Sequence, residues 1–164
     1  MKNILVDSVA LFDAAFYNTT QLGNLACHNL VSSDNEQGIF HNFITTEYAI
    51  INAASLLAKY GEDANLNRST DRRLRKEFAE VIKPYMTNYK NRYEVYRVQD
   101  VNEMMLIGEM FDDLGRLYPL EETIFAYLAT RTYQGAHIMG LASEAYVDCK
   151  IPMYFSFPTD EDVS

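Results

Sequence analysis

Two aspartates near the ends of expected strands are the residues of this sequence best suited to chemistry. Asp7 follows the apolar run Ile4-Leu5-Val6, and Asp160 follows the apolar run 153–157 by a few residues. Ligands of open α/β sheets gather outside the carboxyl ends of strands, and carboxylates placed there can hold Mg²⁺ or Mn²⁺. Such ions activate water against a phosphodiester. Each aspartate also has a purely structural interpretation: Asp7 could cap the next helix, and Asp160 could be part of a solvated acidic tail.

Three short runs have the character of strands that could position these acids. They span residues 3–7, 93–98 and 153–157, and the first holds the consecutive apolar residues Ile4, Leu5 and Val6, as in a strand covered on both faces. Pro84 should end or kink the helix expected at residues 71–83, because proline lacks an N–H donor. The pattern predicts an α/β fold, a small parallel sheet flanked by helices and helix-rich, with an all-α domain as the alternative. The expected helices cover residues 43–59, 71–83, 100–117, 120–132 and 134–147.

The composition indicates a folded domain. The 164 residues are 48% hydrophobic and 13% aromatic, so we expect one domain over residues 1–157 and a flexible acidic tail at 158–164. The apolar stretches are too short to span a membrane, and no signal-peptide pattern opens the chain. Cys27 and Cys149 lack a CxxC spacing, which favours a reducing, cytoplasmic location and leaves their roles open.

The charge is unevenly distributed along the chain. The net charge is −9, yet residues 68–97 hold nine basic and four acidic side chains, so that this segment is +5 and the remainder −14. A solvated helix face is one interpretation of the segment. The other is a local footprint for an anionic partner such as RNA.

Several segments resemble the PIN-domain family. The opening Ile4-Leu5-Val6-Asp7-Ser8-Val9-Ala10-Leu11 is similar to the family's first strand, and residues 43–52 are similar to its second strand and following helix. Residues 136–142 and 151–157 look like its last helix and strand. PIN domains are usually metal-dependent ribonucleases with three or four acidic residues, and many are toxins paired with an inhibitor. The resemblance therefore implies a PIN-like fold, an Mg²⁺ or Mn²⁺ cofactor and RNA as substrate.

The family's acidic positions carry over only in part. Asp7 matches the first acid, and Asp160 matches the fourth but lies later than the pattern places it. The second, a glutamate within the helix, falls on Asn52, although Glu47 lies five residues earlier. The resemblance thus assigns catalysis to Asp7, Glu47 and Asp160, and metal binding to Asp7 and Asp160.

The third acid of the family is an aspartate that opens the last long helix, and it falls on Gly135. Glu122 is the nearest acid upstream. Two of the four positions are therefore uncharged. Each missing carboxylate removes a ligand and a negative charge from a cation site, so a degenerate member would be kept for binding instead of hydrolysis.

Two functions follow, and the sequence leaves both open. The first is a PIN-like, metal-dependent ribonuclease or a nuclease-derived domain. The second is a catalytically inactive, acidic interaction or inhibitor protein that acts through protein–protein contacts. A mostly helical binding protein is a third, weaker alternative. The methionine-rich helix at 100–117 offers an apolar face for a homodimer, and PIN domains commonly dimerise.

Overall fold

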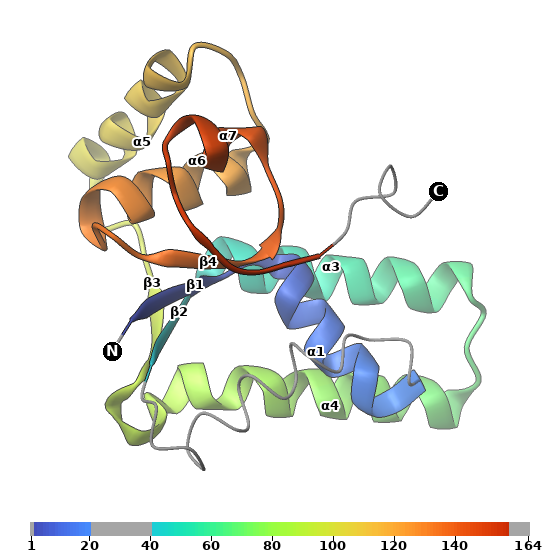
Figure 1. Cartoon of the computed structure of the whole chain (residues 1–164). Helices are drawn as coiled ribbons and strands as arrows, with labels where there is room; N and C mark the ends of the chain where they lie inside the picture. Colours follow the sequence, from blue (N-terminus) through green and yellow to red (C-terminus); the bar gives the residue numbers. More distant parts are fainter. Residues whose placement is uncertain (1, 21–40, 158–164) are drawn as a thin grey trace.

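The computed structural model describes residues 2–20 and 41–157 and contains a five-stranded parallel sheet (Figure 1). The spatial order of the strands is β3-β2-β1-β4-β5, and every neighbouring pair is parallel. The prediction of a helix-rich α/β fold is confirmed, and the all-α alternative is wrong. The strands are β1 (Asn3–Val6), β2 (Asn42–Thr46), β3 (Tyr93–Tyr96), β4 (His137–Leu141) and β5 (Met153–Phe157).

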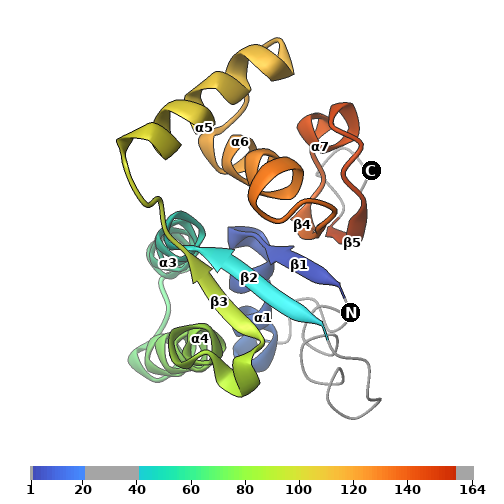
Figure 2. The same cartoon turned by 90° about the vertical axis from the view of Figure 1, so that its left-hand side faces the viewer.

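Helices cover both faces of this sheet, in two layers that Figure 2 shows from the side. One layer holds α1 (Ser8–Thr20), α3 (Glu47–Asp63) and α4 (Arg68–Thr87). The other layer holds α5 (Val101–Leu114), α6 (Leu120–Tyr127) and α7 (Glu144–Asp148). Short helical turns follow α4 at Tyr89–Asn91 and α6 at Leu128–Thr132.

The central strand β1 is buried from both sides. Ile4 lies between Phe43 of β2 and His137 of β4, and Ile4 and Leu5 are fully inaccessible. Because helices cover both faces, the three buried residues Ile4, Leu5 and Val6 all need apolar side chains, which explains the continuous run seen in the sequence. The end of β1 is thereby held rigidly in the middle of the molecule.

Two strands lie where helical periodicity predicted helix. Residues 42–46 form β2, and α3 begins only at Glu47, with Thr46 as its cap. The resemblance to PIN domains indicated a strand before this helix, whereas helical periodicity extended the helix back to residue 43. The helix predicted at 134–147 is wrong, because residues 137–141 form β4 and only Glu144–Asp148 is helical. Ile138 and Met139 are fully buried between β1 and β5. Short apolar runs fit a buried strand as well as a helix, and here strand pairing decides.

Pro84 does not end α4, although ending the helix is one of the two outcomes that the sequence predicted for it. The helix continues to Thr87 and is capped by Asn88, whose left-handed backbone (φ 49°) lets its N–H donate to the carbonyl of Pro84. A proline in a helix deprives the carbonyl four residues earlier of its donor. That carbonyl belongs to Glu80, a solvent-exposed residue, so water can replace the missing donor.

Three sequence predictions fall outside the described residues. They concern Cys27, the tail at 158–164 and its Asp160. In the part of the chain that the structure describes, every helix is too short or too polar to cross a membrane.

Candidate functional site at the carboxyl edge of the sheet

The order of the strands singles out one place at the carboxyl edge. From β1 the chain builds β2 and β3 toward one side of the sheet and β4 and β5 toward the other. The ends of β1 and β4 therefore flank the topological switch point, where open α/β sheets bind their ligands. Asp7 is the first residue after β1 and lies at this position.

Asp7 is held by backbone donors from two elements. Its Oδ1 accepts a hydrogen bond from Ala10 N (2.9 Å), which caps α1, and its Oδ2 accepts one from Leu141 N (2.8 Å) at the end of β4. Its own N–H donates to the carbonyl of Met139 (3.2 Å). Asp7 is only 4% exposed. The side chain therefore caps α1, as the structural interpretation of Asp7 proposed, and it also joins β1 to β4.

Gly140 makes room for this carboxylate. A Cβ atom built on Gly140 would lie 2.0 Å from Cγ of Asp7 and 2.1 Å from each of its oxygens. Its φ of +155° adds to the preference for glycine. The side chain of Asp7 thus lies directly against the β4 backbone.

A second carboxylate, Glu121, reaches the same place from the first turn of α6. Its Oε1 accepts from Ser8 N (2.6 Å), and its Oε2 accepts from Ser8 Oγ (2.7 Å) and from Asn52 Nδ2 (3.0 Å). Ser8 follows Asp7 directly, and Asn52 lies on α3. Glu121 therefore connects the two helical layers across the carboxyl edge of the sheet.

The two carboxylates interact electrostatically. The pKa of Asp7 is raised to about 7, chiefly by burial and also by the negative charge of Glu121, although the N–H groups of Ala10 and Leu141 oppose the rise. The phenol of Tyr146, which is 2% exposed, faces the same group of charges. Burial and the charges of Asp7, Glu122 and Glu121 raise the pKa of Tyr146 far above its usual range, so it stays neutral.

Glu122 makes a parallel connection beside the first. Its Oε2 accepts a hydrogen bond from Ser143 Oγ (2.6 Å), and Ser143 caps α7 through its contact with Ala145 N. Both acids that open α6 are thus bonded to residues at the ends of neighbouring strands.

The sequence-predicted site residues are only partly brought together. Asn52, the uncharged second position, does reach the site through Glu121. Glu47 opens α3 and forms an ion pair with Arg97 (Oε1 to Nε, 2.8 Å). Asp160 lies outside the described residues.

Glu121 is the acid at this edge that the resemblance to PIN domains did not assign. The third acid of that pattern was placed on Gly135, but Gly135 precedes β4, whose first residue pairs with Ile4 at the other end of β1. Glu121, in contrast, lies in the first turn of α6 and reaches the carboxyl edge. The available signal was the pair of acids Glu121 and Glu122 after Pro119, a position that also suits the first turn of a helix.

Mg²⁺ and Mn²⁺ take about six oxygen ligands, several of them from carboxylates in most protein sites. All four carboxylate oxygens of Asp7 and Glu121 already accept hydrogen bonds from N–H or O–H groups of the chain. Among residues 2–20 and 41–157, no three His, Cys, Asp or Glu side chains are grouped to hold a metal ion. As arranged, these residues do not fit such a cation.

Comparisons with known proteins bear on the fold alone. No protein-family model matches the chain, and no curated protein matches it at a significant level. The crystal structure of PAE2754 from Pyrobaculum aerophilum is similar to it, with a TM-score of 0.53 and 15% sequence identity. The match covers 95% of this chain and 90% of that chain. It therefore extends over the whole sheet and its helical layers.

Proposed function

We propose that this chain is a PIN-like, nuclease-derived domain that acts by binding a protein partner instead of cleaving RNA. The observation that carries the proposal is the arrangement at the carboxyl edge, where donors of the chain itself occupy the oxygens of Asp7 and Glu121. Three of the donors to Asp7 and Glu121 oxygens come from the backbone of α1 and β4 and cannot rotate away without moving those elements.

Asn52 supports the same conclusion. The family has a glutamate at this position, whereas here the amide nitrogen donates to Glu121. An amide donor satisfies the negative charge that a cation would otherwise balance. The replacement thus converts a site for a positive ion into an internal hydrogen-bond network.

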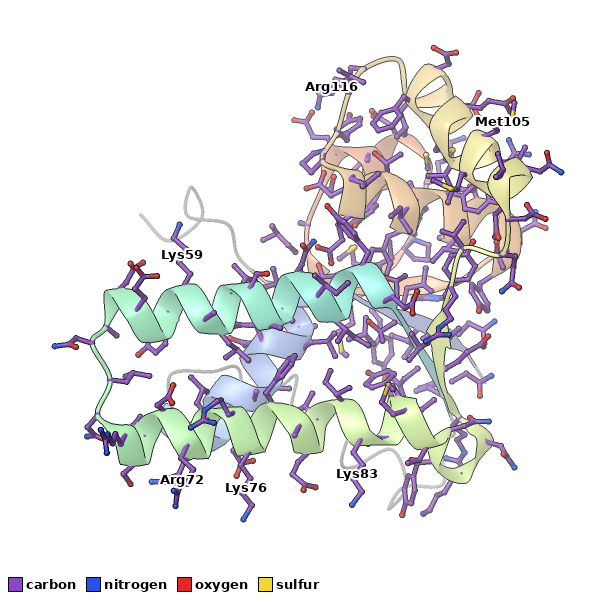
Figure 3. The ribbon with its side chains drawn as sticks, turned by 180° about the vertical axis from the view of Figure 1, so that it is seen from behind. Lys59, Arg72, Lys76, Lys83, Met105 and Arg116 are labelled. Atoms are coloured by element: carbon purple, nitrogen blue, oxygen red, sulfur yellow. The ribbon has the colours of Figure 1, made fainter. Side chains whose placement is uncertain are left out.

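An interaction role is supported by exposed apolar side chains on α5. Val101, Met104, Met105 and Leu106 are each at least half exposed, and Figure 3 shows Met105 projecting from this helix. Contiguous apolar surface of this kind marks protein interaction sites. The acidic remainder of the chain favours a partner with basic groups, in the cytoplasm that the cysteine pattern indicates.

The proposal is tested by thermal unfolding with and without millimolar Mn²⁺, on the native chain and on Asp7→Asn. We expect the unfolding midpoint of both proteins to be unchanged by Mn²⁺, and no manganese-dependent cleavage of single-stranded RNA. A site that binds Mn²⁺ at a hundredfold excess over its dissociation constant would stabilise the fold by ~2.7 kcal/mol. Stabilisation of the native chain alone, together with cleavage, would refute the proposal.

A metal-dependent ribonuclease is the second candidate, and the convergence of Asp7 and Glu121 favours it. Like charges held close together, with a raised pKa, are typical of functional carboxylate sites. The row formed by Arg72, Lys76 and Lys83 points away from the molecule along α4, where it could meet RNA (Figure 3). If this candidate is correct, Glu121→Gln should abolish the manganese-dependent cleavage while the chain stays folded.

A further inference from the structure

A stripe of charged side chains runs along the outer side of α4. Positions 68, 72, 76, 80 and 83 recur every three or four residues, so they lie on one side of the helix. The stripe is about 22 Å long, because an α-helix rises by 1.5 Å per residue. Figure 3 shows three of its members pointing away from the molecule. The stripe consists of Arg68, Arg72, Lys76, Glu80 and Lys83, all of them exposed.

The opposite side of α4 is buried in the molecule. Leu74 and Tyr85 are buried, and Phe78, Val81 and Ile82 pack against the core. This apolar side fixes the rotation of the helix about its axis. The charged stripe therefore stays in water and cannot turn toward the acidic parts of the chain.

The cations of the stripe are not neutralised by the part of the chain that the structure describes. The neighbouring Arg75 pairs with Asp71 (Nε to Oδ2, 3.0 Å), whereas none of the stripe's cations forms an ion pair with a described residue. Glu80 lies one turn from both Lys76 and Lys83 and pairs with neither. Like charges four residues apart destabilise a helix, so an anionic ligand would relieve this repulsion.

Three features favour an acidic protein segment over RNA as that ligand. Glu80 interrupts the cations, whereas every nucleotide of an RNA strand carries a phosphate, so a phosphate would face this carboxylate. The stripe holds no aromatic side chain on which a base could stack. The net charge of −9 also repels a long polyanion from the molecule as a whole.

The spacing of the cations favours a helical segment. A second helix lying along α4 presents its own side chains at the same intervals of three and four residues. It can place carboxylates opposite the cations and an uncharged or basic residue opposite Glu80. Such charge complementarity gives specificity and register more than affinity.

We propose that the stripe on α4 is a docking surface for an acidic helix of a partner protein. The carboxylates of that helix would meet Arg68, Arg72, Lys76 and Lys83. The surface is separate from the exposed apolar residues of α5, which lie in the other helical layer. The inference names a partner surface of the proposed binding function and rests on that function.

The test measures the binding of three fluorescent probes to the full chain by fluorescence anisotropy. The first is an alanine-based helical peptide with glutamate at the spacing of the stripe's cations and lysine at the spacing of Glu80. The second has the same composition in scrambled order, and the third is a short oligouridylate. We expect the native chain to bind the first probe most tightly, and salt to weaken this binding because the charges are exposed.

Substitutions locate the binding surface. Lys76→Gln combined with Lys83→Gln should weaken binding of the first peptide at least about fivefold, since two exposed ion pairs are lost. Lys59→Gln is the matched control, because this exposed lysine lies on α3 and points away from α4 (Figure 3), and it should leave the affinity unchanged. Glu80→Lys makes the row uniformly positive and should reverse the preference in favour of oligouridylate.

Three results would overturn the inference. They are failure of the first peptide to bind, equal binding of the scrambled peptide, and binding that the double lysine variant retains. Tighter binding of oligouridylate by the native chain would identify RNA as the ligand instead. Self-association at low salt that the double variant abolishes would identify the acidic surface of a second copy.

The failure of this inference and that of the proposed function are distinguishable. Manganese-dependent RNA cleavage would refute the proposed function and leaves the peptide measurements to be judged by themselves. Loss of peptide binding without any such cleavage would refute the docking surface alone.

Discussion

Asp7 couples protonation to folding, because its carboxyl group is buried beside another negative charge. Its pKa rises from 3.8 in an unfolded chain to about 7 in the fold. Between these values the folded chain binds more protons, so the contribution of Asp7 to stability is complete below pH 4 and is lost as the pH rises through about 7. The free energy of unfolding should therefore fall across this window, by on the order of 4 kcal/mol. Urea unfolding at a series of pH values measures it.

The matched variant is Asp7→Asn, which carries no titratable group. It keeps an oxygen for Ala10 N but meets Leu141 N with an amide, so it changes both the hydrogen bonds and the charge. The difference in unfolding free energy between the two proteins should depend on pH between 4 and 7 and be constant above pH 8. A difference that does not change with pH would contradict this account.

Gly140 should tolerate no side chain. Gly140→Ala places a methyl group 2.0 Å from Cγ of Asp7, so either the carboxylate or β4 must move. We expect a loss of about 3 kcal/mol in unfolding free energy, at the upper end for overpacking. Gly108→Ala is the control, because Gly108 has nothing within 4 Å and lies in a helix, where alanine stabilises by roughly 0.5–1 kcal/mol. Equal effects of the two substitutions in chemical unfolding would rule out the close approach.

At the scale of elements, α5 is held less firmly than α6, the helix on which it packs. It buries Ile107, Met110 and Leu114, mainly against α6, and leaves its other apolar residues open. Elements with few buried contacts open at free energies below that of global unfolding. The α5 amides should therefore exchange with deuterium faster than those of α6, whose residues 123–127 are all buried. Native-state hydrogen exchange measures this, and equal protection of the two helices would contradict it.

The elements also show where sequence reasoning succeeds. Strands β1, β3 and β5 could be predicted, because β1 is continuously apolar and Pro152 precedes β5. Strands β2 and β4 could not be predicted from periodicity, since each has only five residues and carries apolar residues that fit either structure. Their conformation depends on pairing with β1, which is a tertiary effect.

The residues of the candidate site likewise differ in whether the sequence could predict them. Asp7 could be predicted because it directly follows an apolar run. Glu121 could not, because its approach to Ser8 and Asn52 depends on how α6 is seated over the sheet. Local sequence describes Glu121 only as a favourable acid in the first turn of a helix.

At the scale of the whole molecule, the carboxyl edge is where the two helical layers are joined. Glu121 brings α6 to α1 and α3, and Asp7 ties β1 to β4. Under the proposed function, hydrogen bonds internal to the chain occupy the junction where the resemblance to PIN domains implied a metal ion. Because the first strand lies at the centre of the sheet, the ends of β1 and β4 lie side by side at this junction.

That central position of β1 has a consequence for synthesis of the chain. The hydrogen bond from Leu141 N to Asp7 joins residues 134 positions apart, so the second half of the sheet cannot assemble until almost the entire polypeptide has emerged. At ~5–20 residues per second this takes roughly 7–27 s, during which β1 can pair with β2 but has no partner on its other side. The nascent chain therefore presents a strand that is unpaired on one side and apolar from Ile4 to Val6, the kind of segment that chaperones shield.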